Sequence, residues 1–156
     1  MRMRKKKWAA GLLQERTDVV VADPVQYTGT WKTLIPCEKL HVEIGSGKGD
    51  YWIGMAHKYP SDGWIGIERN TDVAGIAVKM SAGQVLDTMK FIHGDAEDLR
   101  LWFAPKEVDV IHLNFSDPWP KKRNTKRRLT SDGFLDQYAS VLADDGMIQF
   151  KTDNVK

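Results

Sequence analysis

Three glycines stand at alternate positions in HVEIGSGKGD, the stretch from His41 to Asp50. They are Gly45, Gly47 and Gly49, and they directly follow a short apolar run that is typical of a buried strand. A glycine backbone can turn sharply and approach a bound group closely. This loop could therefore hold a phosphate, a nucleotide or a cofactor.

The spacing of the glycines distinguishes three kinds of loop. A P-loop needs GxxxxGK followed by Ser or Thr, whose hydroxyl binds magnesium, and Gly49 follows Lys48 here, so a P-loop is excluded. A dinucleotide-binding loop has GxGxxG, and Asp50 stands where its third glycine would be, so a dehydrogenase is disfavoured but stays open. An acidic residue, a hydrophobic residue and GxGxG are typical of S-adenosylmethionine (SAM) methyltransferases, and Glu43 begins such a pattern.

Two more carboxylates follow the next two strands that we predict along the chain. Glu68 ends GWIGIE, where a carboxylate can accept hydrogen bonds from both hydroxyls of a ribose. Asp95, in HGDAEDL, would lie beside an adenine. Each acid alone is more often a solvated carboxylate or a helix cap, but acids at three successive strand ends favour an adenosine-containing ligand.

The segment LNFSDPWPKKRNTKRR is the most specific one in the chain. Pro118 and Pro120 stiffen the turn and so fix the directions of Asp117 and Trp119. A carboxylate can accept from N1 and N2 of guanine, and an indole can stack on a base. Residues 121–128 then carry six positive charges, the composition that a phosphate backbone requires. We favour a nucleic-acid surface over the alternative of a rigid charged loop.

Charge is unevenly distributed along the 156 residues. Residues 2–7 carry five positive charges, and removing these and the six of residues 121–128 from the net charge of +2 leaves −9 on the rest. Two basic blocks on an acidic body can present a local site for a polyanion.

Cysteine content and hydropathy suggest the compartment. Cys37 is the single cysteine, which excludes an internal disulfide framework and fits a reducing environment. The apolar run in residues 8–13 is too short for an export signal, and no run is long enough to span a membrane. We expect a cytoplasmic protein with no membrane contact.

Alternating strands and helices must position these residues. We expect strands over 40–44, 64–67, 89–93, 108–115 and 147–151, and helices over 50–59, 71–80 and 132–142, the last capped by Ser131 or Asp132. This order predicts βαβ units, hence an α/β fold with a parallel sheet covered on both faces. Ligands bind such sheets at the carboxyl ends of the strands, where the glycines and acids fall.

Histidines and tryptophans suggest packing more than chemistry. The four histidines (His41, His57, His93 and His112) show no ligand spacing with one another or with Cys37, so we predict no metal. His41 and His112 fall inside apolar strands and are expected to be core or edge histidines. We also expect packing roles for Trp8, Trp31, Trp52, Trp64 and Trp102.

In chain order, EIGSGKG, GIE, GDAEDL, NFSDPWPKKR, KRRLT and FKTDN closely resemble the bacterial tRNA (guanine-N7)-methyltransferase family. The resemblance spans essentially the whole chain, and NFSDPWPKKR is a highly specific signature. It implies methyl transfer from SAM to N7 of a guanosine in the variable loop of tRNA, with S-adenosylhomocysteine as the other product. It also implies a Rossmann-like three-layer α/β sandwich with a mainly parallel sheet.

The resemblance further implies roles for individual residues. The cofactor-binding residues would be Glu43, Gly45, Gly47, Gly49, Glu68, Asp95, Ala96 and Asp117. The substrate-binding residues would be Lys121, Arg123, Asn124, Lys126, Arg127, Arg128 and Asp153. Asp117 would also be catalytic, as an acceptor that orients the guanine edge and not as a base, because N7 carries no proton.

The chain departs from the family pattern in two places. Asn124 stands where the family usually has histidine, so that side chain keeps hydrogen bonding without a titratable charge. Sheets of this kind continue past FKTDN with a helix and an antiparallel hairpin, and the family adds a TEYE-like motif there. We expect a basic segment over 1–36 and a methyltransferase domain over 37–156 that lacks the hairpin, as a monomer or homodimer. The strand from Met147 would then be a bare edge.

Two other functions stay open. DPWP resembles the (D/N)PP(Y/F/W) loops of amino methyltransferases, so the target could be another RNA base or an amino group. A non-catalytic RNA-binding relative is the second alternative.

Overall fold

Five parallel strands form one sheet in the computed structural model, which describes residues 6–115 and 132–152. The strand order across the sheet is β3-β2-β1-β4-β5. The strands are β1 Leu40–Ile44, β2 Gly63–Glu68, β3 Met89–His93, β4 Val108–Phe115 and β5 Leu142–Thr152. The longer helices are α1 Ala9–Glu15, α3 Asp50–Lys58, α4 Thr71–Met80 and α6 Asp132–Val141. The short ones are η1 Pro24–Tyr27, α2 Trp31–Leu34, η2 Ala96–Asp98 and α5 Leu99–Trp102.

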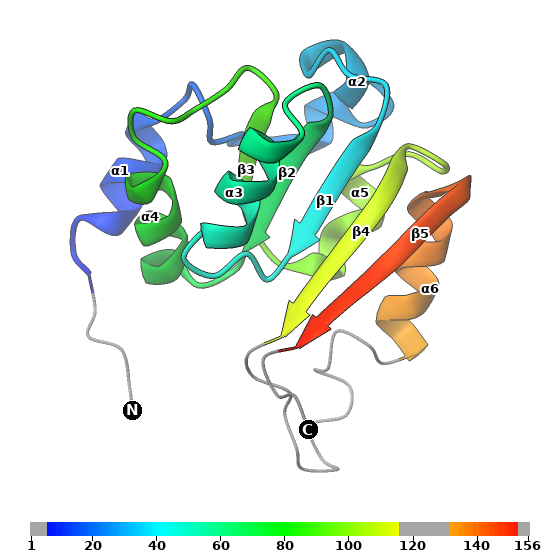
Figure 1. Cartoon of the computed structure of the whole chain (residues 1–156). Coiled ribbons are helices and arrows are strands. Elements are labelled where there is room, and N and C mark those ends of the chain that lie inside the picture. Colours follow the sequence, from blue (N-terminus) through cyan, green and yellow to red (C-terminus); the bar gives the residue numbers. More distant parts are fainter. Residues whose placement is uncertain (1–5, 116–131, 153–156) are drawn as a thin grey trace.

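The sheet is the middle of three layers (Figure 1). One core packs α3, α4 and the end of α1 on the first face, and the other packs α2, α5 and α6 on the second. β1 is the middle strand: Val42 pairs with Ile65 of β2 on one side and with Ile111 of β4 on the other. The predicted α/β fold with a parallel sheet is confirmed.

The main elements predicted from the sequence are present, with one shifted boundary. β5 begins at Leu142, where we expected helix until 142 and a strand only from 147. Val108 pairs with Leu142, and after an irregularity Val110 pairs with Met147. The residues between, ADDG, have the composition of a turn, which concealed this strand start.

Residues 6–36, which we assigned to a separate basic segment, share the core of the fold. Trp31 is fully buried and donates from Nε1 to the carbonyl oxygen of Trp102 across 2.7 Å. Ala9 of α1 packs against Gly75 of α4, where an added Cβ would lie 2.5 Å from the Cβ of Ala9. The boundary at residue 36 stays a prediction.

The packing roles predicted for five tryptophans are confirmed, four of them in the core and one on the surface. Trp31, Trp52, Trp64 and Trp102 are buried. Trp8 is 40% exposed, and its indole lies against α4, where an added Cβ at Gly75 would be 3.5 Å from its Cζ3 atom. The Nζ of Lys79 lies 4.9 Å from the centroid of that indole ring.

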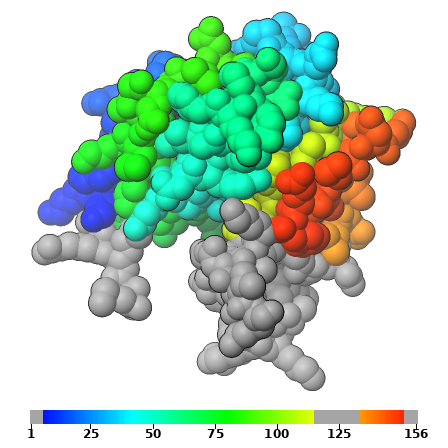
Figure 2. Space-filling view, in the orientation of Figure 1, coloured from blue at the N-terminus to red at the C-terminus, as the bar shows by residue number. Residues whose placement is uncertain are grey.

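β5 forms an edge of the sheet and one side of the molecule (Figure 2). Met147 and Phe150 on this strand are 52% and 58% exposed, as a bare edge strand predicts. All strand pairings in the described ranges are parallel. Within those same ranges, no helix has the length and hydropathy needed to cross a membrane.

Candidate cofactor site

The parallel strands bring their carboxyl ends to one edge of the sheet (Figure 1). β1 ends at Ile44 and continues into the glycine loop, while β2 ends at Glu68 and β3 at His93. The amides of Gly45 and Ser46 both donate to the carbonyl oxygen of Ile67 across 2.9 Å, so the loop is tied to the end of β2.

Two of the glycines have different roles. Gly47 has a φ of +58°, and an added Cβ would meet no atom within 4 Å, so its backbone faces open space that a ligand can use. Gly49 has a φ of +91°, and an added Cβ would lie 3.0 Å from the Cβ of Ala77 on α4. Gly49 therefore allows close packing of the loop against α4, beyond any contact it makes with a ligand.

Glu43 is a buried carboxylate at the end of β1. Its side chain is 2% exposed, and Oε2 accepts from Nδ2 of Asn114 across 2.5 Å. Oε1 has no hydrogen-bond partner among the residues that the structure describes. Burial raises the pKa of Glu43 to about 7, hydrogen bonding to Asn114 and to the Ser46 hydroxyl opposes this rise, and the charge of Glu68 adds to it. A cationic or N–H donor from a ligand would satisfy Oε1.

Asn114 was missed in the sequence analysis, although it belongs to the NFSDPWPKKR signature. Glu43 pairs with His112 in the register of β1 and β4, and Asn114 is one pleat further on the same face of β4. The available signal was a polar residue inside an apolar strand.

Glu68 ties the end of β2 to the glycine loop. Its Oε1 accepts from the amide of Gly47 across 2.9 Å, and its Oε2 accepts from the amide of Asn70 across 3.0 Å. Asn70 in turn caps α4 by accepting from the amide of Val73. Since each carboxylate oxygen has two lone pairs, Glu68 can still accept from ribose hydroxyls while it braces the loop.

Asp95 and Ala96 follow β3 at the same edge. Asp95 caps η2 by accepting at Oδ1 from the amide of Glu97 across 2.9 Å. Its Oδ2 lies 4.0 Å from Nη1 of Arg69, in an exposed ion pair. Ala96 is buried. The predicted acids of β1, β2 and β3 thus all lie at the carboxyl ends of the strands.

These residues fit SAM. An ammonium group could donate to Oε1 of Glu43, which has no partner within the described ranges, and a ligand could approach the open backbone at Gly47. Glu68 and Asp95 could serve as acceptors for a ribose and an adenine. The polar groups at this site are carboxylate oxygens and backbone groups, which suit a ligand made of an amino acid joined to a nucleoside.

Known proteins share this arrangement in sequence. The family model described as "Putative methyltransferase" matches residues 37–156. The tRNA (guanine-N(7)-)-methyltransferase of Levilactobacillus brevis is 46% identical over 155 residues, which are 99% of this chain and 72% of that protein. The enzyme of the same name from Limosilactobacillus reuteri is 44% identical over 156 residues, 99% of this chain and 73% of its own length. The chain belongs to the tRNA (guanine-N7)-methyltransferase family.

Solved structures of other methyltransferases share the fold of this family member. An antibiotic-related methyltransferase matches 78% of this chain and 61% of its own, with a TM-score of 0.62 and 18% identity. The phosphoethanolamine N-methyltransferase 2 of Haemonchus contortus in complex with S-adenosyl-L-methionine matches 77% of this chain and 26% of its own, with a TM-score of 0.55 and 16% identity. The predicted Rossmann-like methyltransferase fold is confirmed.

The remaining predicted site residues of the methyltransferase lie outside the described residues. They are Asp117, Lys121, Arg123, Asn124, Lys126, Arg127, Arg128 and Asp153. β4, which leads to Asp117 in the sequence, ends at Phe115.

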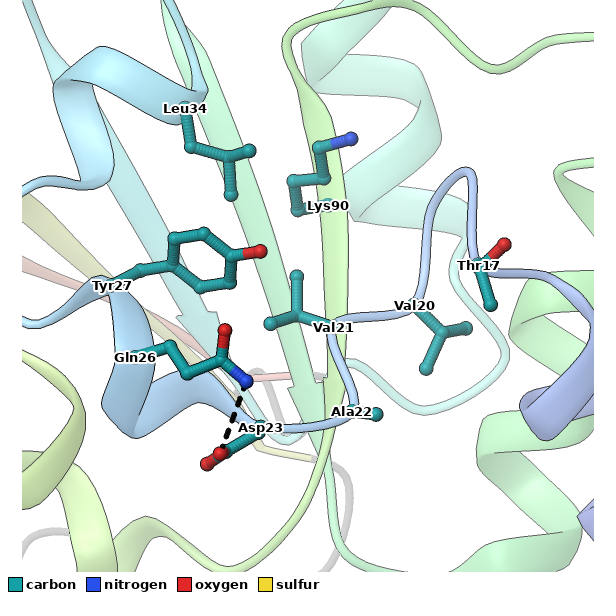
Figure 3. A pocket seen from close by; sticks show the side chains of 9 residues that line it. All are labelled: Thr17, Val20, Val21, Ala22, Asp23, Gln26, Tyr27, Leu34 and Lys90. Carbon is teal, nitrogen blue, oxygen red and sulfur yellow. Dashed lines mark hydrogen bonds between the residues drawn. The ribbon is translucent and has the colours of Figure 1, made fainter.

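A cavity of about 250 Å³ lies elsewhere, between residues 17–27 and Lys90 of β3 (Figure 3). Asp23 accepts there from Nε2 of Gln26 across 3.2 Å, and the ring of Tyr27 borders the opening. None of the glycine-loop residues lines it, so it is separate from the cofactor site. In residues 6–115 and 132–152, no three His, Cys, Asp or Glu side chains gather as a metal site would require.

Proposed function

We propose that this chain transfers the methyl group of SAM to N7 of a guanosine in the variable loop of tRNA. The observation that supports this most strongly is the buried Glu43 just before a GxGxG loop, whose Oε1 has no hydrogen-bond partner in residues 6–115 and 132–152. Identity of 46% to a tRNA (guanine-N(7)-)-methyltransferase over 99% of the chain supports the choice of target. A cytoplasmic location and tRNA as the partner follow from this function.

The chemistry requires alignment and no general base. SAM, when bound, supplies an electrophilic methyl group, and N7 takes it up with its in-plane lone pair while the electrons of the broken C–S bond stay on sulfur. Because N7 has no proton to lose, the protein has to hold the two reactants in line and exclude competing geometries.

The residues would divide this work between them. Glu43 would accept from the ammonium group of SAM, the backbone at Gly47 would lie against its amino-acid part, and Glu68 would accept from the ribose hydroxyls. Asp95 and Ala96 would border the adenine. Asp117 would accept from the guanine edge and orient it. Lys121, Arg123, Asn124, Lys126, Arg127, Arg128 and Asp153 would bind the RNA.

Nucleoside mass spectrometry tests the product. The purified protein is incubated with SAM and a tRNA transcript, which is then digested to nucleosides. We expect 7-methylguanosine, located in the variable loop when fragments are mapped. A matched transcript with 7-deazaguanosine in that loop removes the accepting nitrogen and should stay unmethylated. Methylation at another base or at an amino group would contradict the proposed target.

Separate titrations of SAM and of tRNA test whether the chain is an enzyme or a binding module. We expect each to bind in the absence of the other. Binding of tRNA by a protein that does not bind SAM would instead support the non-catalytic alternative.

A further inference from the structure

Four side chains form a continuous line of hydrogen bonds between the sheet and α3. Oδ2 of Asp62 lies 2.8 Å from Nε2 of His41, and Nδ1 of His41 lies 2.9 Å from Nε2 of His112. The hydroxyl of Tyr51 lies 2.9 Å from Nδ1 of His112. The four residues come from the turn before β2, from β1, from β4 and from α3, and the cofactor site described above uses none of them.

The protons along this line have one consistent arrangement. A carboxylate only accepts, so Nε2 of His41 donates to Asp62. Burial lowers the pKa of His41, and burial together with neighbouring His41 lowers the pKa of His112 to about 4, so both rings are neutral near pH 7. A neutral imidazole has a single N–H, so Nδ1 of His41 accepts from Nε2 of His112. Nδ1 of His112 then accepts from the hydroxyl of Tyr51.

Packing fixes the two rings. The ring of His41 stacks on the buried indole of Trp64, with centroids 3.9 Å apart and planes 10° apart. His112 is 1% exposed, and its ring lies 5.2 Å from Trp64 and 5.4 Å from Tyr51. Neither imidazole can turn without displacing an aromatic neighbour, so the hydrogen bonds are held in direction.

The inner end of the line reaches the cofactor site. Tyr51 is the second residue of α3 and stands two positions after Gly49. His41 and His112 are each one pleat before Glu43 and Asn114, on the same face of their strands. Burial raises the pKa of the Tyr51 hydroxyl, and the charge of Glu43 adds to this rise.

We propose that Asp62, His41, His112 and Tyr51 form a positioning chain that holds the first turn of α3, and with it the glycine loop, in the geometry that receives SAM. The proposal rests on the proposed function in naming SAM as the ligand. Gly49, in the left-handed region, joins the glycine loop to the first turn of α3. Without the Tyr51 hydrogen bond, that turn loses a side-chain anchor, and ordering it on binding would cost affinity.

Tyr51→Phe tests the chain, with Tyr59→Phe as a matched control at the other end of the same helix. Calorimetric titration of SAM should give a Kd about fivefold higher for Tyr51→Phe, because a buried acceptor on His112 loses its donor. Tyr59→Phe should bind like the parent. At saturating SAM, kcat and the KM for tRNA should be unchanged in both variants. Equal Kd values for the two variants would overturn the proposal.

A double-mutant cycle with His112→Phe tests whether the residues act as one chain. We expect the Kd of the Tyr51→Phe/His112→Phe protein for SAM to be no higher than the higher of the two single-variant Kd values. Fully additive losses would overturn the chain. Circular dichroism and thermal unfolding of each variant establish that it is folded before binding is compared.

Histidine tautomers give a readout that does not depend on SAM. In ¹⁵N-histidine-labelled protein at pH 7, His41 and His112 should both carry the proton on Nε2 and none on Nδ1. A proton on Nδ1 of either residue would overturn the arrangement. If the parent protein bound no SAM, the proposed function would fail, while these spectra would still report on the hydrogen-bonded chain.

Discussion

Nδ2 of Asn114 lies 2.5 Å from Oε2 of Glu43, and this contact joins the carboxyl ends of the two central strands at the glycine loop. It satisfies one oxygen of a carboxylate that is almost entirely buried, and the other has no partner among the described residues. Burying a carboxylate oxygen without a hydrogen-bond partner is costly in the free protein. A ligand that donates a hydrogen bond to it on binding would remove this cost.

Glu43→Gln should weaken SAM binding by about tenfold or more, because a charged acceptor contributes roughly 1.5–3 kcal/mol to a hydrogen bond. Calorimetric titration of SAM measures the change. Glu38→Gln, which alters an exposed carboxylate shortly before β1, is the matched control and should bind as the parent does. If Glu43→Gln bound SAM as tightly as this control, Glu43 would have no part in the site.

The pKa of Glu43 predicts a pH-dependent stability of the free protein. Its value of about 7 in the folded state is above the ordinary 4.5, so the folded state keeps a proton that the unfolded chain has released. The free energy of unfolding should therefore fall as the pH rises from 4.5 to 7, by about 3 kcal/mol from this residue. Glu43→Gln should lack this slope in denaturant titrations across that range. Parallel profiles for the two proteins would contradict the raised pKa.

SAM binding should show the opposite trend. If the ligand donates to the ionised carboxylate, affinity rises as the pH increases through about 7 and levels off above it. Asn114→Ala removes a hydrogen bond that favours ionisation, so its affinity profile should shift to higher pH. A Kd that stays constant from pH 6 to 8.5 in the parent protein would argue against this linkage.

His112 predicts a loss of stability in acid. Its folded-state pKa of about 4 is below the ordinary 6.5, so the unfolded chain binds a proton first as the pH falls. The free energy of unfolding should decrease from pH 6.5 to 4, by about 3 kcal/mol at most from this residue. His112→Gln should flatten this part of the curve, whereas His57→Gln, at an exposed histidine, should keep it. Equal slopes in both variants would be inconsistent with a neutral buried His112.

Alanine substitutions should separate the roles of two glycines. Gly49→Ala places a Cβ 3.0 Å from Ala77 at a φ of +91°, so it should destabilise the fold by about 2 kcal/mol. Gly47→Ala meets no atom and carries only the left-handed strain of roughly 1 kcal/mol, but its methyl group enters the space left for a ligand. We expect Gly47→Ala to lose more SAM affinity and Gly49→Ala more thermal stability. If Gly47→Ala lost more thermal stability and Gly49→Ala more SAM affinity, the two glycines would have the opposite roles.

The position of the glycine loop between β1 and α3 was predictable because its signal is local. Glu43 and the glycines lie within seven residues, and a strand followed by GxGxG has few structural solutions. Asn114 is 71 positions from Glu43, and its role depends on the pairing of β1 with β4, which single-sequence patterns do not specify. His41 and His112 were expected to be core or edge histidines, and they are largely buried, but their mutual contact depends on the same strand pairing.

The docking of α1 was not predictable for a different reason. Its contact with α4 is between Ala9 and Gly75, two residues without any strong sequence signal. Small residues fit closely only once the partner surface is known.

The strand order has a consequence for synthesis of the chain. β1, β2 and β3 pair in the order in which they are made, so half of the sheet and the glycine loop can assemble before β4 leaves the ribosome. β4 must then return to the far side of β1, across a long separation that slows folding. Until it arrives, the carboxylate of Glu43 lacks Asn114 and stays hydrated, so completion of the methyl-donor site would mark the late stage of folding.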